Sequence, residues 1–248
     1  MGLIASCIKR LGFSNKTFIL LGLLLIGLFP TPAACDSAVV LVYHRFGEDN
    51  FPLTNITIEQ FEAHISELKN GDFTIMSLPD IINRQRSGER LPSRTVGISI
   101  DDAYQSIYDE AWPRLKDAGF PFTLFVSTDP IDAGYDGVMS WNQIREMQKD
   151  GVTIGAHTSS HLHMNFQSPK RLYNELNHSN NRFKEELGDI PTLFAYPYGE
   201  TSLTIETIVK ETGYVAAFGQ HSGAFSGDDN PFNLPRFPMN EKYGNIGR

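Results

Sequence analysis

Two kinds of segment alternate along most of this chain, and this alternation constrains the fold more than any other feature of the sequence. Six short runs are apolar and rich in β-branched residues, as expected of buried strands. They occupy residues 38–43, 95–100, 122–126, 152–156, 192–196 and 214–218. Segments with helical spacing lie between them, at 57–68, 105–116, 140–149, 169–187 and 201–210.

The ends of the helical segments carry the residues that favour helix termination and initiation. Ser140 and Ser168 are expected to be N-caps. A glycine sits just past each of five segments, where a left-handed C-cap is favoured: Gly71, Gly119, Gly151, Gly188 and Gly213. Alternating strands and helices with short connections predict an α/β fold in which helices cover parallel strands. In such a fold, functional residues gather at the carboxyl ends of the strands.

The N-terminus has a different pattern, which is typical of an export signal. Basic residues precede an uncharged apolar run at 18–29, and the small residues Ala33 and Ala34 follow it. The run is shorter than the roughly 20 apolar residues that span a bilayer. We therefore predict a signal peptide at 1–34 and a single domain at 38–248.

Two alternatives for the leader stay open: an uncleaved membrane anchor, and lipid attachment at Cys35 after cleavage. In each case the domain is exported, to the periplasm or the cell exterior. Cys7 and Cys35 are the two cysteines of the chain, so the predicted domain has no internal disulfide. The formal charge is −8 for all 248 residues, and this acidic balance argues against nucleic acid as a partner.

The pair Asp101-Asp102 directly follows the run 95–100. Adjacent side chains at a strand end point in different directions, so the two carboxylates can take different roles. One could bind a metal while the other serves as a base. Taken alone, the pair could equally cap a helix that begins near Tyr104.

Two histidines follow the run 152–156. His157 and His161 are four positions apart, so we expect them to share one face of a helical turn and to bind one metal together. His163 is one residue too far round and is expected at the surface or behind the ligands. With one carboxylate, the two histidines make the three-ligand set of a catalytic zinc site. The remaining carboxylate could then accept a proton from water.

Aromatic residues at the end of another run could contact a sugar. The segment FAYPYG at 194–199 offers the flat faces of Tyr196 and Tyr198, and a backbone N–H there could stabilise an oxyanion. On its own, a buried aromatic turn is the better interpretation. Trp141 could also stack on a sugar ring, although a core position at a helix start is the preferred interpretation.

Together, the Asp-Asp pair, the H-T-x-x-H motif at 157–161 and the Pro-Tyr-Gly turn at 197–199 resemble the polysaccharide deacetylases of the NodB-like chitooligosaccharide deacetylase superfamily, carbohydrate esterase family 4. The resemblance extends over about 38–239. It is greatest to the branch of biofilm poly-N-acetylglucosamine deacetylases, because of VYHRF at 42–46 and FAYPYG. It implies an irregular, parallel (β/α) barrel with fewer strands than the standard eight.

The resemblance also implies roles for individual residues. Asp101 would be the general base, and Asp102, His157 and His161 would bind a divalent metal, Zn²⁺ by preference. Tyr198 would lend its backbone N–H to the oxyanion.

The chain departs from the family pattern at three places. Ala103 replaces the glycine that usually closes the T-F-D-D-G motif, and it could narrow the approach to the metal. Ala195 stands where an arginine usually orients the base, and Arg236 is our candidate to replace that arginine as the partner of Asp101. The Leu-x-His motif that usually supplies the general acid has no clear copy. His44 is the preferred substitute because it follows the first strand, and His221 is its rival. His44 could instead be a neutral, hydrogen-bonded neighbour of the site.

These features predict a hydrolase that removes N-acetyl groups from an N-acetylglucosamine-type polysaccharide of the envelope or the cell exterior, with release of acetate. One alternative keeps the enzyme and changes the substrate, for example to an O-acetyl ester. The other is a glycan-binding module of the same fold with little catalysis. The expected partner is an acetylated polysaccharide or oligosaccharide, with membrane contact only through an uncleaved signal or a lipid anchor.

Overall fold

The strands of the domain form one large curved sheet and one small one. A computed structural model describes residues 37–245, so the predicted signal peptide at 1–34 lies outside the described residues. The strands of the larger, nine-stranded sheet are β1 (Ser37–Tyr43), β4 (Thr74–Ile75), β5 (Thr95–Asp101), β6 (Thr123–Val126), β7 (Thr153–Ala156), β8 (Leu193–Ala195), β9 (Ala216–Phe218), β10 (Ala224–Ser226) and β11 (Phe237–Pro238). A second sheet pairs β2 (Arg45–Phe46) with β3 (Asn55–Ile56).

The order of the larger sheet is β10-β1-β5-β6-β7-β8-β9, with β11 added to β1 and β4 added to β5. Every pairing in this sheet is parallel except that of β1 with β10. Each of the six predicted strands is present within a residue or two of its predicted bounds. The prediction of an α/β fold with parallel strands is therefore confirmed.

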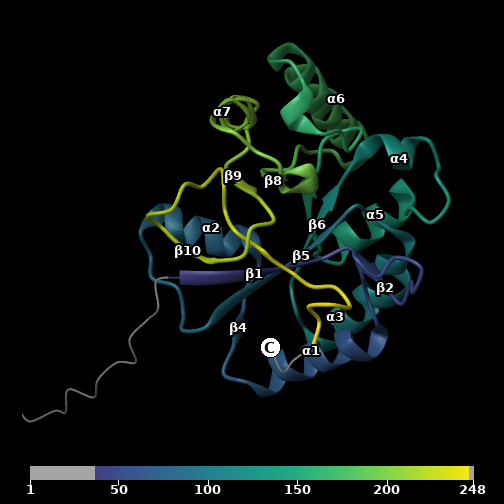
Figure 1. The fold of residues 1–248 in the computed structure, drawn as a ribbon, viewed down its shortest axis with the longest axis vertical. Coiled ribbons are helices and arrows are strands. Elements are labelled where there is room, and N and C mark those ends of the chain that lie inside the picture. Colours follow the sequence, from purple (N-terminus) through teal and green to yellow (C-terminus); the bar gives the residue numbers. More distant parts are fainter. Residues whose placement is uncertain (1–36, 246–248) are drawn as a thin grey trace, which may run out of the picture. The chain divides into compact units, whose positions relative to one another are not determined.

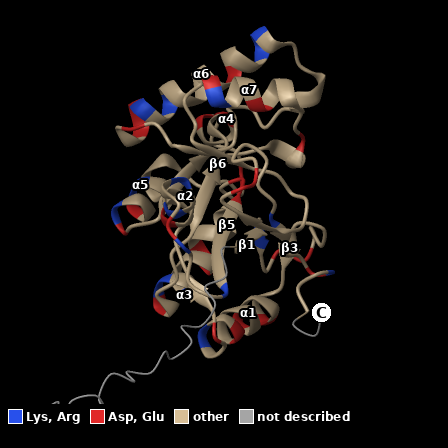
Figure 2. Cartoon of the chain, turned by 90° about the vertical axis from the view of Figure 1, so that its left-hand side faces the viewer, with Lys and Arg blue, Asp and Glu red and all other residues tan. Residues whose placement is uncertain are grey.

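Helices surround this sheet (Figure 1). They are α1 (Ile58–Asn70), α2 (Leu78–Ser87), α3 (Trp112–Ala118), α4 (Thr128–Asp132), α5 (Trp141–Lys149), α6 (Pro169–Leu187) and α7 (Leu203–Glu211), together with a π-helical turn η1 (Ile107–Ala111) and two 3₁₀ turns, η2 (Met164–Phe166) and η3 (Pro197–Gly199). Acidic and basic residues are interspersed along α1, α3, α5 and α6 (Figure 2). Within residues 37–245, no helix combines the length and apolar character needed to cross a bilayer.

The predicted helix termini are mostly confirmed. The hydroxyls of Ser140 and Ser168 accept the backbone N–H groups of Gln143 and Arg171, as N-caps do. Gly119 and Gly188 are left-handed C-caps. The prediction for Gly71 is wrong: its φ of −84° is extended, because the chain turns directly toward β4.

Strand β5 shows how the two faces of the sheet are used. Val96, Ile98 and Ile100 belong to the core cluster beneath the outer helices. The alternate residues face the other way, as the two-residue period of a strand requires. Of these, Gly97 contacts helix α2, where an added Cβ would lie 2.5 Å from Leu78 Cδ2. Helix α2, which the sequence patterns did not predict, therefore fills the inner face and needs a glycine opposite it.

A C-terminal segment joins the two edges of the sheet. Leu234 exchanges backbone hydrogen bonds with β9, since its N–H donates to Ala217 and its carbonyl accepts from Gly219. Phe237 pairs with Leu41 of β1. The segment between them thus bonds to both β9 and β1 and completes an irregular barrel, as predicted.

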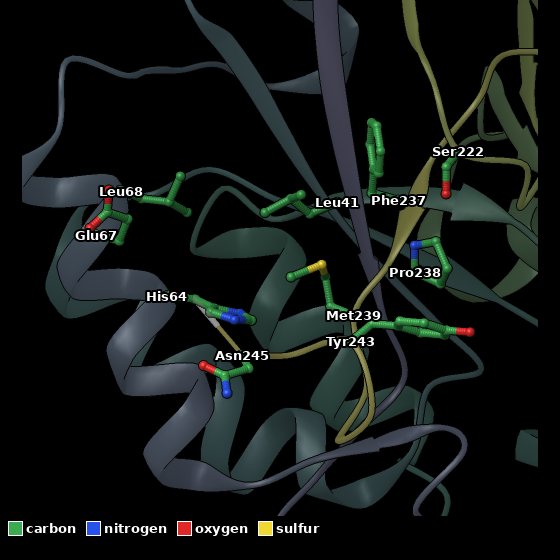
Figure 3. A pocket seen from close by; sticks show the side chains of 10 residues that line it. All are labelled: Leu41, His64, Glu67, Leu68, Ser222, Phe237, Pro238, Met239, Tyr243 and Asn245. Carbon is green, nitrogen blue, oxygen red and sulfur yellow. The ribbon is translucent and has the colours of Figure 1, made fainter. Parts of the chain in front are cut away.

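One groove lies outside this barrel, between α1 and the C-terminal segment (Figure 3). Its volume is about 640 Å³, and its lining includes Leu41, His64 and Met239. None of the predicted site residues lines it. The chemistry is therefore expected elsewhere, at the strand ends.

Candidate active site

Three side chains meet at the carboxyl ends of β5 and β7. The Nε2 atoms of His157 and His161 lie 3.4 Å and 3.3 Å from Oδ1 of Asp102. One potential ligand atom from each residue lies within 4.8 Å of the others, so the three could hold one metal ion. They are the described residues that form such a group. The predicted gathering of polar residues at strand ends is confirmed.

The loop that carries the two histidines is not the helical turn that their spacing indicated. Thr158 and His161 have φ values of 66° and 53°, in the left-handed region that non-glycine residues seldom adopt. The predicted helical turn is therefore wrong. The two imidazoles nevertheless meet, with their ring centroids 4.8 Å apart.

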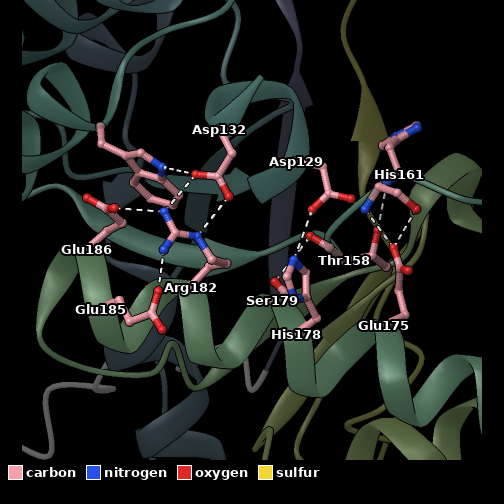
Figure 4. A network of polar contacts seen from close by, with 12 residues as sticks. Asp129, Asp132, Thr158, His161, Glu175, His178, Ser179, Arg182, Glu185 and Glu186 are labelled. Carbon is pink, nitrogen blue, oxygen red and sulfur yellow. Dashed lines mark hydrogen bonds and ion pairs between the residues drawn. The ribbon is translucent and has the colours of Figure 1, made fainter. Parts of the chain in front are cut away.

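Helix α6 holds this loop from behind (Figure 4). Oε1 of Glu175 accepts the backbone N–H of Ser160 at 2.6 Å and its hydroxyl at 2.7 Å. The hydroxyl of Ser179 donates to the carbonyl of Thr158 at 3.2 Å. Glu175 is 1% exposed, so its carboxylate is a buried anchor. These bonds stabilise a backbone conformation that is otherwise costly.

Sequence reasoning missed Glu175, although a signal was present. The buried face of α6 includes Leu172, Leu176 and Phe183, and Glu175 lies in the same stripe. An acidic residue within an apolar helix face is rarely left without a partner. The signal did not identify the partner, because a loop backbone has no pattern in the sequence.

The donor atoms fit a divalent cation. Nδ1 of His157 lies 2.7 Å from the carbonyl oxygen of Ala195, which can only accept, so this nitrogen carries the proton. Nε2 of a neutral His157 then presents a lone pair to the Asp102 carboxylate. Nε2 of His157 and Oδ1 of Asp102 both carry lone pairs and lie 3.4 Å apart, so a proton or a cation is needed between them. Two imidazoles and one carboxylate are also a ligand set that zinc uses in catalytic sites.

The charges of the cluster agree with this fit. When no cation lies between His157 and Asp102, a proton on Nε2 of His157 takes that place. Burial raises the pKa of Asp102, but the hydrogen bond and charge of the protonated His157 outweigh it and hold that pKa well below its ordinary value. Burial lowers the pKa of His157, but Asp102 and Asp101 raise it more, and the net shift is upward. Burial and the neighbouring His157 lower the pKa of His161 to about 4. At neutral pH both Asp102 and His161 are therefore in the forms that bind metals.

The neighbouring carboxylate has a different environment. Oδ1 and Oδ2 of Asp101 each accept a hydrogen bond from Arg236, both at 2.8 Å, and both side chains are fully buried. Arg236 also donates to the hydroxyl of Ser99 at 3.2 Å and to the carbonyl of Gly219 at 2.8 Å. Burial raises the pKa of Asp101, but the charge of Arg236 outweighs it and the net shift is downward. Asp101 is thus held ionised next to the cluster.

Arg236 reaches Asp101 because it lies on the segment that joins β9 to β1. It is the partner that the sequence suggested, in place of an arginine at position 195. The catalytic role of the pair stays a prediction.

The two candidates for the general acid differ in position. Nε2 of His44, which follows β1, lies 4.0 Å from Oδ2 of Asp101. Burial lowers the pKa of His44 more than the nearby carboxylates raise it. His221 is exposed, and within residues 37–245 no hydrogen bond or ion pair connects its side chain to the cluster. The geometry therefore favours His44 over His221 as the candidate for the general acid.

The aromatic candidates divide into one exposed residue and two buried ones. Tyr198 is 49% exposed, has a left-handed φ of 59°, and its ring lies 4.6 Å from that of His161. Tyr196 is fully buried, and its hydroxyl donates to the carbonyl of Phe232 at 2.8 Å. Trp141 packs in the core, and its Nε1–H donates to Asp132. Tyr196 and Trp141 thus occupy the buried positions that the sequence analysis preferred for them, and a contact of either ring with a sugar stays a prediction.

Ala103 has little influence on access to the cluster. Its side chain is fully buried in the core cluster, although its φ is 58°. The expectation that Ala103 narrows the approach to the metal is not supported, because its methyl group packs in the core.

The fold and this site define a class: α/β-barrel enzymes with a candidate metal site and an ionised carboxylate at the carboxyl ends of parallel strands. A sequence profile of the family described as polysaccharide deacetylase matches residues 88–217, slightly more than half of the chain. The chain therefore belongs to the polysaccharide deacetylase family and is a hydrolase.

Individual relatives agree with this assignment. The chain is 25% identical to a poly-β-1,6-N-acetyl-D-glucosamine N-deacetylase of Staphylococcus aureus, over 83% of this chain and 80% of the relative. The structure of IcaB from Ammonifex degensii superposes with a TM-score of 0.74 at 26% identity, covering 85% of this chain and 94% of IcaB. The Streptococcus pyogenes deacetylase PplD, solved in complex with acetate, has a TM-score of 0.76 at 20% identity, covering 82% of this chain and 92% of PplD, and shows the same fold.

Proposed function

We propose that this chain removes N-acetyl groups from an N-acetylglucosamine polysaccharide and releases acetate, with Zn²⁺ held by Asp102, His157 and His161. The observation that carries the proposal is the pairing of two unlike carboxylates. Asp102 faces two imidazoles, whereas the adjacent Asp101 is held ionised by Arg236. The relatives named as poly-β-1,6-N-acetyl-D-glucosamine N-deacetylases support the choice of sugar.

The protein groups around the cluster provide the proton transfers. When bound, zinc supplies Lewis acidity that polarises an acetamide carbonyl and makes a water more acidic. Asp101 is ionised and can accept the proton of the attacking water. Its orientation is fixed by the two hydrogen bonds from Arg236.

The remaining groups act on the oxygen and nitrogen of the amide. The backbone N–H of Tyr198 is the proposed donor to the developing oxyanion. His44 is the proposed donor of a proton to the leaving nitrogen, so that acetate and a free amine result. Burial lowers the pKa of His44, so its ring is neutral at neutral pH and must take up a proton before it can donate one. Asp101, whose Oδ2 lies 4.0 Å from Nε2 of His44, is the proposed source, since it accepts the proton of the attacking water.

We also propose that the domain works outside the cytoplasm. The support is the pattern of the leader: basic residues, an apolar run at 18–29 and small residues at 33–34. Fractionation of cells that express the full chain tests this directly. A shortened product outside the cytoplasm supports a cleaved signal, and retention in the cytoplasm contradicts export.

The activity is tested by acetate release from an N-acetylglucosamine pentamer, with and without added zinc. We expect zinc-dependent release, reduced about 100-fold or more in the Asp101→Asn variant. Asp109→Asn, at an exposed carboxylate that accepts a hydrogen bond from Gln105, is the matched control and should retain activity. Release from O-acetyl esters alone would change the substrate to an ester. Tight zinc binding without turnover on either substrate would favour the glycan-binding module.

A further inference from the structure

We propose that three aromatic side chains beside the metal cluster, Tyr198, His163 and Phe166, bind sugar units next to the one that loses its acetyl group. We call them the aromatic strip. This inference rests on the proposed function, because it assigns a polymeric ligand to the same site. The expected ligands of the aromatic strip are neutral pyranose rings, whose C–H faces pack against aromatic rings.

The strip starts at the cluster itself. The ring of Tyr198 meets that of His161 edge to face at 4.6 Å and 68°. The same ring stacks on His163 at 3.9 Å and 8°, nearly parallel. His163 in turn contacts Phe166 at 5.8 Å. A series of ring contacts therefore connects a candidate metal ligand to a surface residue.

The strip is exposed where a ligand could reach it. Phe166 is 80% exposed, Tyr198 is 49% exposed, and the side chain of His163 is 49% exposed. Leaving apolar rings in water is unfavourable, and connected apolar surface of this kind is often a binding site. Among the exposed large hydrophobic residues in the described chain, Tyr198 and Phe166 are the two that ring contacts connect to the cluster.

The strip is also held in place before any ligand binds. Nδ1 of His163 lies 3.0 Å from Oε1 of Glu200, and Gln167 donates to the carbonyl of His163 at 3.2 Å. The fully buried Met164 fixes the 3₁₀ turn η2, which carries Phe166. A rigid surface loses little conformational entropy when a ligand binds. This arrangement suits stacking on sugar rings better than a mobile loop would.

The strip predicts a dependence on substrate length. Tyr198 contacts a metal ligand, so even a short substrate at the metal reaches it. Phe166 is separated from His161 by two further rings, so only a longer substrate extends to it. Removal of the Phe166 ring should therefore weaken the binding of long oligomers more than that of short ones.

The test compares Phe166→Ala with Leu203→Ala in the full, zinc-loaded chain. Leu203 is equally exposed, at 80%, but lies on α7 and has no ring contact with the strip, so it is the matched control. Binding of N-acetylglucosamine dimers and pentamers, with both β-1,6 and β-1,4 linkages, is measured by calorimetry in the Asp101→Asn background, which prevents turnover. Acetate release is measured in the wild-type background.

We expect Phe166→Ala to weaken pentamer binding about 3- to 10-fold, while dimer binding changes less than twofold and Leu203→Ala changes neither. Unchanged pentamer binding, equal loss for dimer and pentamer, or the same loss in Leu203→Ala would overturn the strip. Acetate release that is indifferent to Phe166 would leave the proposed function standing without the strip. Phe166-dependent binding of a pentamer that is never hydrolysed would leave the strip standing without the proposed function.

Discussion

Arg236 and Asp101 form a fully buried ion pair, and its two members respond differently to substitution. Removing Arg236 leaves a buried carboxylate without a partner, which typically costs about 3–5 kcal/mol. It also frees Asp101 to turn away from the cluster, whereas Asp102 and the two histidines keep their own contacts. A substitution of Arg236 should therefore disturb the general base Asp101 more than it disturbs metal binding.

We accordingly predict that Arg236→Ala lowers turnover about 100-fold or more, with zinc content close to one per chain. Arg236→Lys should recover part of the activity, because it restores one charge but not the two parallel hydrogen bonds. Turnover and zinc content are measured on the same folded sample. Parallel loss of both would show that Arg236 acts on the metal site as a whole.

His64 is buried beside the groove, away from the cluster. Its Nε2 lies 2.7 Å from the carbonyl oxygen of Gly244, and its Nδ1 lies 3.0 Å from the hydroxyl of Tyr43. A neutral ring satisfies both contacts, and burial lowers its pKa below the ordinary value of 6.5. The other titratable groups that line the groove are Glu67 and Tyr243.

The imidazole of His64 takes up a second proton more readily in the unfolded chain than in the folded chain. The contribution of His64 to stability is therefore complete above about pH 6.5 and is lost as the pH falls below it. We predict that the free energy of unfolding of the wild type falls more steeply between pH 7 and 5 than that of His64→Gln. Urea denaturation across this range measures it. Equal slopes would contradict the assignment, since other histidines contribute equally to both proteins.

At the scale of elements, two of the sets of polar contacts that helix α6 makes have different partners (Figure 4). One set, from Glu175 and Ser179, holds the loop of the metal ligands. The other, from Arg182, binds Asp132 at 2.8 Å and does not touch that loop. The two sets provide a natural comparison on one helix.

We predict that Glu175→Ala weakens zinc binding about 10-fold, in the range found for groups that orient metal ligands. Glu175→Gln should recover most of the affinity, because its carbonyl can still accept from Ser160. Arg182→Ala should lower the melting temperature without changing zinc affinity. Competition with a chromogenic chelator gives the affinities. Equal weakening in both alanine variants would mean that α6 acts only through general stability.

Helix α2 and strand β5 meet at Gly97, so this contact tests the packing inside the barrel. Gly97→Ala places a methyl group against Leu78 and should cost about 1–3 kcal/mol. Leu78→Ala should cost about 2–5 kcal/mol through the cavity that it leaves. Because the new methyl group partly fills that cavity, the double variant should be more stable than the sum of the two losses. Strict additivity, measured by urea denaturation, would contradict direct contact.

For the whole molecule, local patterns predicted the elements well but not how the ends of the sheet are joined. The strands at 95–100 and 152–156 could be predicted because buried parallel strands are short apolar runs. Helix α2 has a short buried face of Leu78, Ile81 and Ile82 inside a polar sequence, and no strand pattern marks β10 or β11. These elements depend on contacts across the fold, which a local pattern does not encode.

The site could be predicted to a similar degree. The residue types and their strand-end positions identified the Asp101-Asp102 pair, His157 and His161, and the family resemblance singled out Asp102 as the ligand. The structure places Asp102 together with both histidines. The left-handed loop could not be predicted, because it depends on how α6 packs behind it. Sequence therefore indicates which groups are available, and packing decides which of them reach the site.

We propose that deacetylation by this chain depends on a metal held by Asp102, His157 and His161. The most direct test is to titrate the metal-depleted full chain with zinc while acetate release from an N-acetylglucosamine pentamer is followed. We expect activity that rises from near zero and saturates at one zinc per chain, and a His161→Ala variant that needs far more zinc for any activity. Full activity in the metal-depleted chain, or an unchanged titration in His161→Ala, would contradict it.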